Sequence, residues 1–156
     1  MKKEEYGEEY NEHLLKQYIL YVEMADQISR RRAQSNHLYI SLLSAFLAFI
    51  SVVVAKDFFI ILSDAIFLVL SLVGILLCLT WYANIHSYKQ LNKLKFQVIH
   101  EIEKELPFAG YKREWEIDKN KKNKYIRLTR IENSLPIFML IPYLILACYA
   151  LFHLTQ

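Results

Sequence analysis

The feature that most constrains this chain is the placement of its charges. No Asp, Glu, Lys or Arg occurs in residues 33–55, 65–88 or 133–156. Each stretch is long enough to supply the roughly 20 apolar residues that an α-helix needs to cross a bilayer. In a water-soluble bundle, three such helices would have no polar face to turn toward solvent. The sequence therefore predicts an all-α integral membrane protein with three transmembrane helices.

The predicted transmembrane spans are residues 38–55, 58–82 and 135–154. Lys56 and Asp57 are the polar break between the first two spans, so we expect an external turn there and a tight helical hairpin. Pro136 falls in the predicted opening turn of the third span, where proline is tolerated. Pro142 falls inside that span, where we expect it to kink the helix.

The basic residues are distributed unevenly around the spans. Six of the 19 Lys and Arg residues precede the first span, twelve lie between the second and third spans, one is Lys56, and none follows the third span. Cytoplasmic segments near membrane spans accumulate Lys and Arg. We therefore predict that residues 1–37 and 83–134 are cytoplasmic, whereas the 56–57 turn and the C-terminus lie outside.

Two apolar stripes indicate helices that continue beyond the spans. The first stripe precedes the first span and consists of Leu14, Tyr18, Val22, Ala25 and Ile28. The second follows the second span and consists of Leu91, Leu94, Val98, Ile102 and Leu106. Their spacing is typical of amphipathic helices, and Pro107 ends the second. We expect a long antiparallel helical hairpin that extends into the cytoplasm.

Some cytoplasmic residues fit more than one arrangement. A second possibility is that part of each stripe packs against other subunits, because one helix pair cannot cover every apolar position, such as Tyr21, Phe96 and Ile99. Contact with the lipid surface fits less well, because the helices continue from membrane spans. Residues 119–124 form a basic run without stacking aromatics or a binding motif, so we expect no nucleic-acid partner. Residues 125–129 alternate between apolar and polar, as in a short strand or a simple return connection.

Asp64 is the one acidic residue inside a predicted span. A carboxylate at the centre of a bilayer costs about 3 kcal/mol, whereas each Leu, Ile, Phe or Val returns about 0.3–0.6 kcal/mol, so insertion remains favourable. Ionisable groups within spans often mark ion pathways. Asp64 is therefore a candidate intramembrane polar site that lines a cavity or a subunit seam. The alternative is that its carboxylate reaches water at the outer surface.

Three basic residues stand where the first helix approaches the inner leaflet, namely Arg30, Arg31 and Arg32. Each basic residue at such a place contributes about 1 kcal/mol against anionic lipid. They are candidate inner-interface anchors, and specific binding of a lipid headgroup or nucleotide is the alternative. Tyr39, Trp81 and Tyr82 are expected in the headgroup layer, which favours amphipathic rings.

Three histidines lie near the inner boundary or on the cytoplasmic helix, namely His37, His86 and His100. They are candidate pH-sensitive residues, because imidazole changes charge near neutral pH. Packing or simple exposure is the alternative role. His100 and Glu101 resemble half of a zinc-protease motif, but position 104 is Lys where the second histidine is required.

The sequence contains no motif for catalysis or cofactor binding. Glycine occurs only at positions 7, 74 and 110, which excludes a glycine-rich phosphate loop and a nucleophile elbow. Cys78 and Cys148 lie in apolar stretches, where a thiol behaves as a small apolar side chain. We predict no enzymatic activity, no catalytic residue, no cofactor and no metal site.

Four segments of the cytoplasmic portion carry a family resemblance, namely residues 21–30, 88–107, 114–115 and 129–132. In these segments the chain resembles the RipA-like small bacterial membrane proteins, a family described as octameric. The resemblance implies a ring-like homo-oligomer in the bacterial cytoplasmic (inner) membrane, with a role in stress response. The layout is also similar to that of SLATT-type proteins, two-span effectors of bacterial conflict systems, but the third span departs from that pattern.

Two functions fit these observations. The first is a non-enzymatic homo-oligomer whose long helices build a cytoplasmic collar around a pore or a lipid-filled centre. The second is a membrane anchor or sensor, such as a defence-system effector, whose cytoplasmic helices bind a soluble protein or a nucleotide. The expected partners are the lipid bilayer, further copies of the chain and, in the second case, a soluble cytoplasmic protein.

Overall fold

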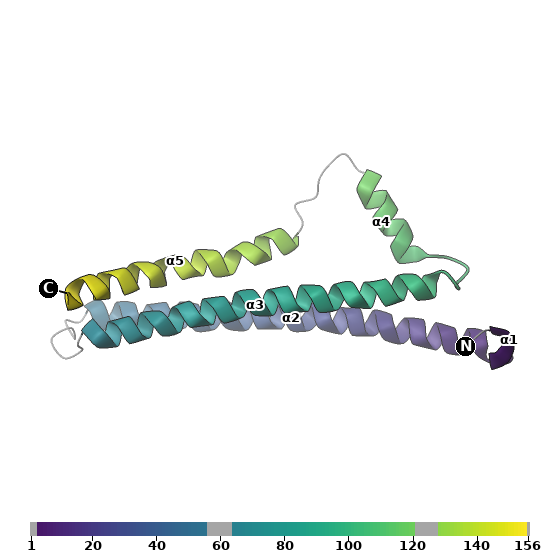
Figure 1. The fold of residues 1–156 in the computed structure, drawn as a ribbon, viewed down its shortest axis with the longest axis horizontal. Helices are drawn as coiled ribbons and strands as arrows, with labels where there is room; N and C mark the ends of the chain where they lie inside the picture. The colour runs from purple at the N-terminus through teal and green to yellow at the C-terminus, as the bar shows by residue number, and fades with distance from the viewer. Residues whose placement is uncertain (1–2, 56–63, 121–127, 156) are drawn as a thin grey trace. The chain divides into compact units, whose positions relative to one another are not determined.

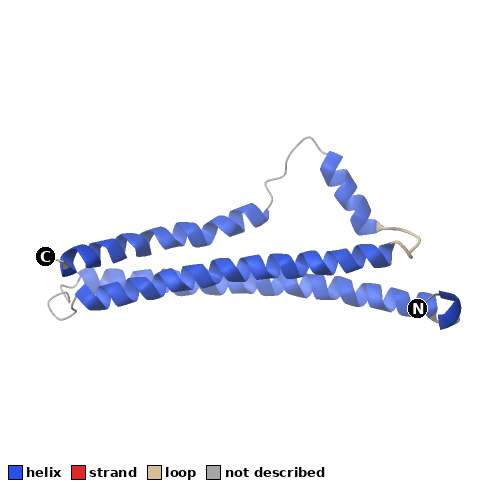
Figure 2. Cartoon of the chain, viewed as in Figure 1, coloured by secondary structure: helices blue, strands red, loops and turns tan. Residues whose placement is uncertain are grey.

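The computed structural model of the chain describes residues 3–55, 64–120 and 128–155. These residues form helices and no strand (Figure 2). In chain order the helices are α1 (Lys3–Tyr6), α2 (Tyr10–Ala55), α3 (Asp64–Glu103), α4 (Gly110–Asn120) and α5 (Leu128–Leu154) (Figure 1). The predicted all-α fold is confirmed.

The longest helix is α2, which runs for 46 residues. Gly7 separates it from α1, and its φ of 92° lies in the left-handed region that favours glycine. No proline or glycine follows within α2, so nothing in its sequence interrupts the backbone hydrogen bonds. The uninterrupted helix predicted up to Ala55 is present.

Three helical segments are long and apolar enough to cross a membrane, namely Tyr10–Val53, Asp64–Glu103 and Ile131–Leu154. They belong to α2, α3 and α5. Together with the helical fold they confirm the prediction of three transmembrane helices. The predicted turn at 56–57 and the predicted first residues of the second span, 58–63, lie outside the described residues.

The spacing of buried residues in α3 explains how it pairs with α2. Its buried positions in the apolar part are Phe67, Ser71, Gly74, Cys78, Trp81 and Ile85. Steps of four and three residues alternate, which gives an average period of 3.5 and keeps one seam of the helix turned toward its neighbour. This is the spacing of helices that pack side by side over many turns.

The chain packs as two compact units. Unit 1 contains residues 1–31 and 88–125, and so includes the N-terminal part of α2, the C-terminal part of α3, and α4. Unit 2 contains residues 32–87 and 126–156, and so includes the remaining parts of α2 and α3 together with α5.

The core of unit 2 lies where α2, α3 and α5 run side by side (Figure 1). Its buried side chains are Leu43, Ile50, Phe67, Cys78, Trp81, Ile85, Tyr143 and Ala150. Away from this core, α3 and α5 expose large apolar side chains, among them Leu72, Leu76, Phe138 and Ile145. Contact of these side chains with lipid hydrocarbon lacks the free-energy cost of contact with water. Their exposure is therefore typical of a unit that spans a bilayer.

The prediction for Pro136 is wrong. We expected it in the opening turn of its helix, but α5 already begins at Leu128, so both Pro136 and Pro142 are interior. Neither residue has an amide hydrogen to donate to the carbonyl four residues earlier. Residues 125–127 of the expected strand or connection lie outside the described residues, and the next two residues begin α5.

Two further expectations about unit 1 are wrong. Leu91 and Leu94 are exposed instead of lying in the seam. Ile99 is fully buried within the single chain, and Phe96 contacts the Tyr111 ring edge-on at 5.4 Å between ring centroids. The seam on α3 is therefore rotated from the predicted stripe, because α4 covers a side of α3 that the predicted two-helix hairpin leaves open.

Candidate functional site

In unit 2, polar side chains tie α2 to α3. Trp81 Nε1 donates a hydrogen bond to Asn36 Oδ1 at 2.9 Å, and both residues are buried. One turn away, Asn84 Nδ2 donates to Ser35 Oγ at 2.8 Å. The groups are neutral and paired, so they specify how the two helices align without burying a charge.

The position of Trp81 differs from the prediction. We expected its ring in the headgroup layer, but Trp81 is fully buried and stacks on Tyr39 with 5.8 Å between ring centroids. Tyr82, the next residue, is about half exposed. The heptad spacing turns Trp81 inward, because it is the residue that follows Cys78 by three positions in the buried seam.

The third long helix is attached through Tyr143 of α5. Its hydroxyl donates a hydrogen bond to the carbonyl of Leu43 at 2.8 Å, and the side chain is fully buried. The ring lies flat against Gly74 of α3, where no space remains for a Cβ atom. Glycine at this position therefore allows α3 and α5 to approach closely.

An ion pair between α2 and α5 lies in the same unit. Arg32 Nη2 and Glu132 Oε2 are 3.4 Å apart, and their side chains are 17% and 14% exposed. Arg32 Nε and Glu132 Oε2 have no hydrogen-bond partner among the described residues. Arg32 thus turns toward α5, which separates it from its two exposed neighbours, Arg30 and Arg31.

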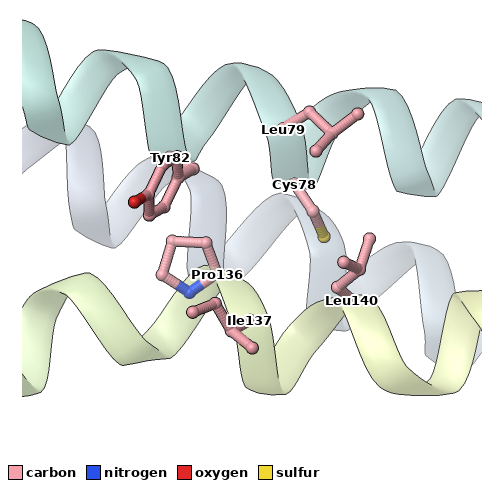
Figure 3. Close-up of a pocket in the computed structure, with 6 residues that line it drawn as sticks. All are labelled: Cys78, Leu79, Tyr82, Pro136, Ile137 and Leu140. Carbon is pink, nitrogen blue, oxygen red and sulfur yellow. The ribbon is translucent and has the colours of Figure 1, made fainter.

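Figure 3 shows an apolar cavity between α3 and α5 of unit 2. Its volume is about 210 Å³, and it is lined by Cys78, Leu79, Tyr82, Pro136, Ile137 and Leu140. The surfaces that face it are apolar, so it suits a hydrocarbon chain and offers no group that could activate a substrate.

In unit 1 the carboxylate of Glu103 is buried, with its side chain 1% exposed. The backbone amides of Tyr111 and Lys112 donate to its two carboxylate oxygens at 2.8 and 3.2 Å. Tyr18 donates its hydroxyl hydrogen at 3.3 Å, and His100 Nδ1 lies at 3.1 Å. Glu103 therefore caps the first turn of α4 and links it to α2 and α3.

The hydrogen bonds decide the charge of Glu103. Burial by itself would raise the pKa of this carboxyl group, but the hydrogen bonds from the Tyr111 amide, His100 and the Lys112 amide outweigh it and lower the pKa below its ordinary value. Burial and the neighbouring carboxylate raise the pKa of Tyr18, so its hydroxyl stays protonated and can donate. Glu103 is ionised at neutral pH, which favours its place at the N-terminus of α4.

Asp64, another predicted site residue, is partly exposed as the first residue of α3. Two of the predicted histidines, His37 on α2 and His86 on α3, are exposed. The third, His100, pairs with Glu103. Among the described residues, no group of three His, Cys, Asp or Glu side chains is arranged to hold a metal ion. The structure thus brings together His100 with Glu103, and Arg32 with Glu132.

Sequence reasoning missed Glu103, Glu132 and Asn36. The spacing of Glu103 is a signal for its burial. Glu103 follows the buried Ile99 by four residues and precedes the part-buried Leu106 by three, which are the steps of a heptad repeat. Its donors follow eight and nine residues later across a turn. The partner of Glu132 on α2 has no comparable signal, because it is 100 residues away in the chain.

The fold and the polar ties define the class of protein. Three long apolar helices, joined by neutral buried hydrogen bonds and bordered by a charged helical portion, make a helical membrane protein. The profile of the octameric membrane protein family (8xMP) matches residues 15–152, and the chain belongs to this family. This confirms the prediction of an octameric membrane protein family. No curated protein and no solved structure matches the chain.

Proposed function

We propose that eight copies of the chain form a closed, non-enzymatic ring in the bacterial cytoplasmic (inner) membrane. The name of the family supports an assembly of eight. The Lys and Arg distribution supports a cytoplasmic N-terminus and an external C-terminus. In this arrangement residues 1–37 and 83–134 form a cytoplasmic collar, and Arg30 and Arg31 anchor the ring to the inner leaflet.

One observation in unit 2 carries the proposal that copies meet through α2. One side of the exposed surface of α2 in its apolar part bears small or hydroxyl side chains, namely Ser41, Ser44, Ala45, Ala48 and Ser51, and the large exposed side chains Leu38, Leu42, Phe49 and Val52 lie beside them. The exposed faces of α3 and α5 bear mostly Leu, Ile, Val and Phe. Small residues favour close helix contacts in membranes, and hydroxyls tolerate water better than large apolar side chains do. This face of α2 therefore meets a neighbouring copy or a water-filled centre, and α3 and α5 meet lipid.

The centre of the ring is a pore or is filled with lipid, and the resemblance to RipA-like proteins associates the assembly with stress response. Asp64, at the start of α3, lines a polar cavity or a subunit seam in this proposal. Native mass spectrometry of the purified protein tests the ring, and ion flux into liposomes tests the pore. We expect a mass of eight chains and sustained flux that Ser41→Leu reduces and Leu76→Ala leaves unchanged.

A monomer in native mass spectrometry would contradict the ring. An octamer without flux would leave the ring and exclude a conducting pore. If Asp64→Asn changes neither assembly nor flux, the proposed role of Asp64 is wrong.

The exposed aromatic residues of unit 1 favour a second candidate, a membrane anchor or sensor that binds a soluble cytoplasmic protein or a nucleotide. Phe108 and Trp115 are 72% and 53% exposed, beside the basic residues Lys112 and Arg113. Aromatic and basic side chains together are frequent in protein interfaces. A defence-system effector is one form of this alternative. An octamer without flux whose binding of one purified partner is abolished by Trp115→Ala would favour it.

A further inference from the structure

Unit 1 has two charged surfaces on the sides of α2 and α3 that face away from their common seam. The α2 outer face consists of Glu12, Lys16, Ile19, Glu23 and Asp26. The α3 outer face consists of Lys93, Leu94, Gln97 and Glu101, and Lys104 follows in the turn after α3 ends at Glu103. All ten residues are exposed, and steps of three or four residues place the α2 set on one side of its helix. In α3 the steps from Lys93 to Gln97, from Leu94 to Gln97 and from Gln97 to Glu101 are four, three and four residues, so these side chains share the outer side.

Contacts inside unit 1 determine which residues of the two helices are at the same level. The Tyr18 hydroxyl lies 3.3 Å from Glu103, and Lys95 Nζ lies 3.3 Å from Met24 Sδ. The helices are antiparallel, so rising numbers in α2 correspond to falling numbers in α3. At about 1.5 Å per residue, Asp26 is therefore level with Lys93.

The same rule places the remaining charges. Counted from the Met24–Lys95 and Tyr18–Glu103 contacts, Lys16 is about two to four residues from the level of Glu101, and Glu12 is about three to five residues from Lys104. These offsets are roughly 3–8 Å, which long side chains can span. Along the helix axes of unit 1, the α2 outer face thus has the order negative, positive, negative, and the α3 residues with Lys104 have the order positive, negative, positive at similar levels.

A ring in a membrane adds a geometric constraint. Its symmetry axis is normal to the bilayer, so each residue has the same height in every copy, and a closed ring of eight needs two different, complementary surfaces on each copy. If α2 met α2 of the next copy, Glu12 would face Glu12 and Asp26 would face Asp26. Contact between α2 and α3 of adjacent copies instead pairs opposite charges at all three levels.

We propose that the α2 outer face of one copy packs against the α3 outer face of a second copy of this chain, in the register that pairs Asp26 with Lys93. The inference rests on the proposed ring. Ile19 and Leu94 supply apolar contact, and the charges select the neighbour and the register, since exposed ion pairs contribute little stability by themselves.

Disulfide trapping in the full-length protein tests the proposal. Glu23 and Gln97 lie at the same level to within about one residue, on outward faces of different helices. In a background with Cys78→Ala and Cys148→Ala, Glu23→Cys combined with Gln97→Cys should give a ladder of linked chains up to the octamer on oxidation. Neither single variant should link, because each places only one thiol at each seam.

The outcomes distinguish the proposed seam from the proposed ring. Linked dimers from Glu23→Cys alone would show that α2 meets α2 and would overturn the proposal. An octamer in native mass spectrometry that gives no ladder would overturn the seam and leave the ring intact. A monomer would overturn both.

Charge exchange provides a second measurement in the native cysteine background. Asp26→Lys places two positive charges at one level, and we expect a smaller fraction of the protein to form the octamer. Adding Lys93→Asp restores the opposite charges, and we expect the octamer to return. A double variant that assembles no better than the single variant would contradict the register. Arg113→Asp, on α4, is the matched control and should leave the octamer unchanged.

Discussion

Units 1 and 2 satisfy their buried polar groups in different ways. Unit 1 buries a charged carboxylate, Glu103, and surrounds it with two backbone amides and two side chains. Unit 2 relies mainly on neutral partners, such as Asn36 with Trp81, and the charged side chains of its Arg32–Glu132 pair keep 17% and 14% of their surface exposed. Several hydrogen-bond donors offset the free-energy cost of removing a charge from water. In hydrocarbon few such donors are available, so the cost remains.

The difference also extends to how each unit attaches its third helix. In unit 1, the short helix α4 depends on one side chain of α3 that caps its first turn. In unit 2, α5 depends on close apolar packing around Gly74 and on one hydrogen bond from Tyr143. We therefore expect steric changes to be most harmful in unit 2 and changes of charge to be most harmful in unit 1.

The largest effect is expected for Gly74→Ala in unit 2. The added Cβ overlaps the buried Tyr143 ring, so α5 must move away from α3. We expect a loss of about 3 kcal/mol in stability, measured as a lower unfolding temperature in detergent. Gly110→Ala is the matched control, because its Cβ would lie 3.7 Å from Phe108, an ordinary contact. Equal unfolding temperatures for the two variants would contradict the packing argument.

The next effect is expected for Glu103→Gln in unit 1. The amide keeps one acceptor but turns a donor toward the first turn of α4 and removes the charge. We expect α4 docking to weaken by about 2 kcal/mol, seen as faster hydrogen exchange at the Tyr111 and Lys112 amides. Glu101→Gln changes an exposed carboxylate two residues away and should leave that exchange unaltered.

A somewhat smaller effect is expected from acid. The pKa of Glu103 in the folded protein lies below its ordinary value of 4.5, so folding favours the charged form. Its contribution is fully present above that value and is lost as the pH falls through the lowered pKa. Hydrogen exchange in α4, corrected for the intrinsic pH dependence, should become faster as the pH falls below the ordinary pKa of Glu103. A profile of the same shape in Glu103→Gln would assign the effect to another group.

The smallest effect is expected for Trp81→Phe. The aromatic packing against Tyr39 remains, but the Asn36 oxygen loses its donor inside unit 2. We expect a loss of about 1 kcal/mol, measured by thermal unfolding. Trp115→Phe is the control, because that side chain is more than half exposed. Each variant keeps one tryptophan, so its emission identifies the unit being observed.

Much of the fold could be read from local properties of the chain. Membrane insertion depends on the summed hydropathy of consecutive residues, so the absence of charge from three stretches was sufficient to predict three spanning helices. The apolar stripe that precedes the first span was likewise sufficient to predict that the helix now seen as α2 continues beyond the span. These predictions required no knowledge of which segments meet.

The candidate polar sites required that knowledge, because burial of a charged side chain depends on partners from distant segments. Arg30, Arg31 and Arg32 are alike in the sequence, yet only Arg32 turns toward a carboxylate, and that carboxylate belongs to α5. Glu101 and Glu103 are the same type of residue, two positions apart. The turn before α4 brings backbone amides to Glu103 alone of the two. Hydropathy acts residue by residue along the chain, whereas desolvation of a charge acts through its three-dimensional surroundings.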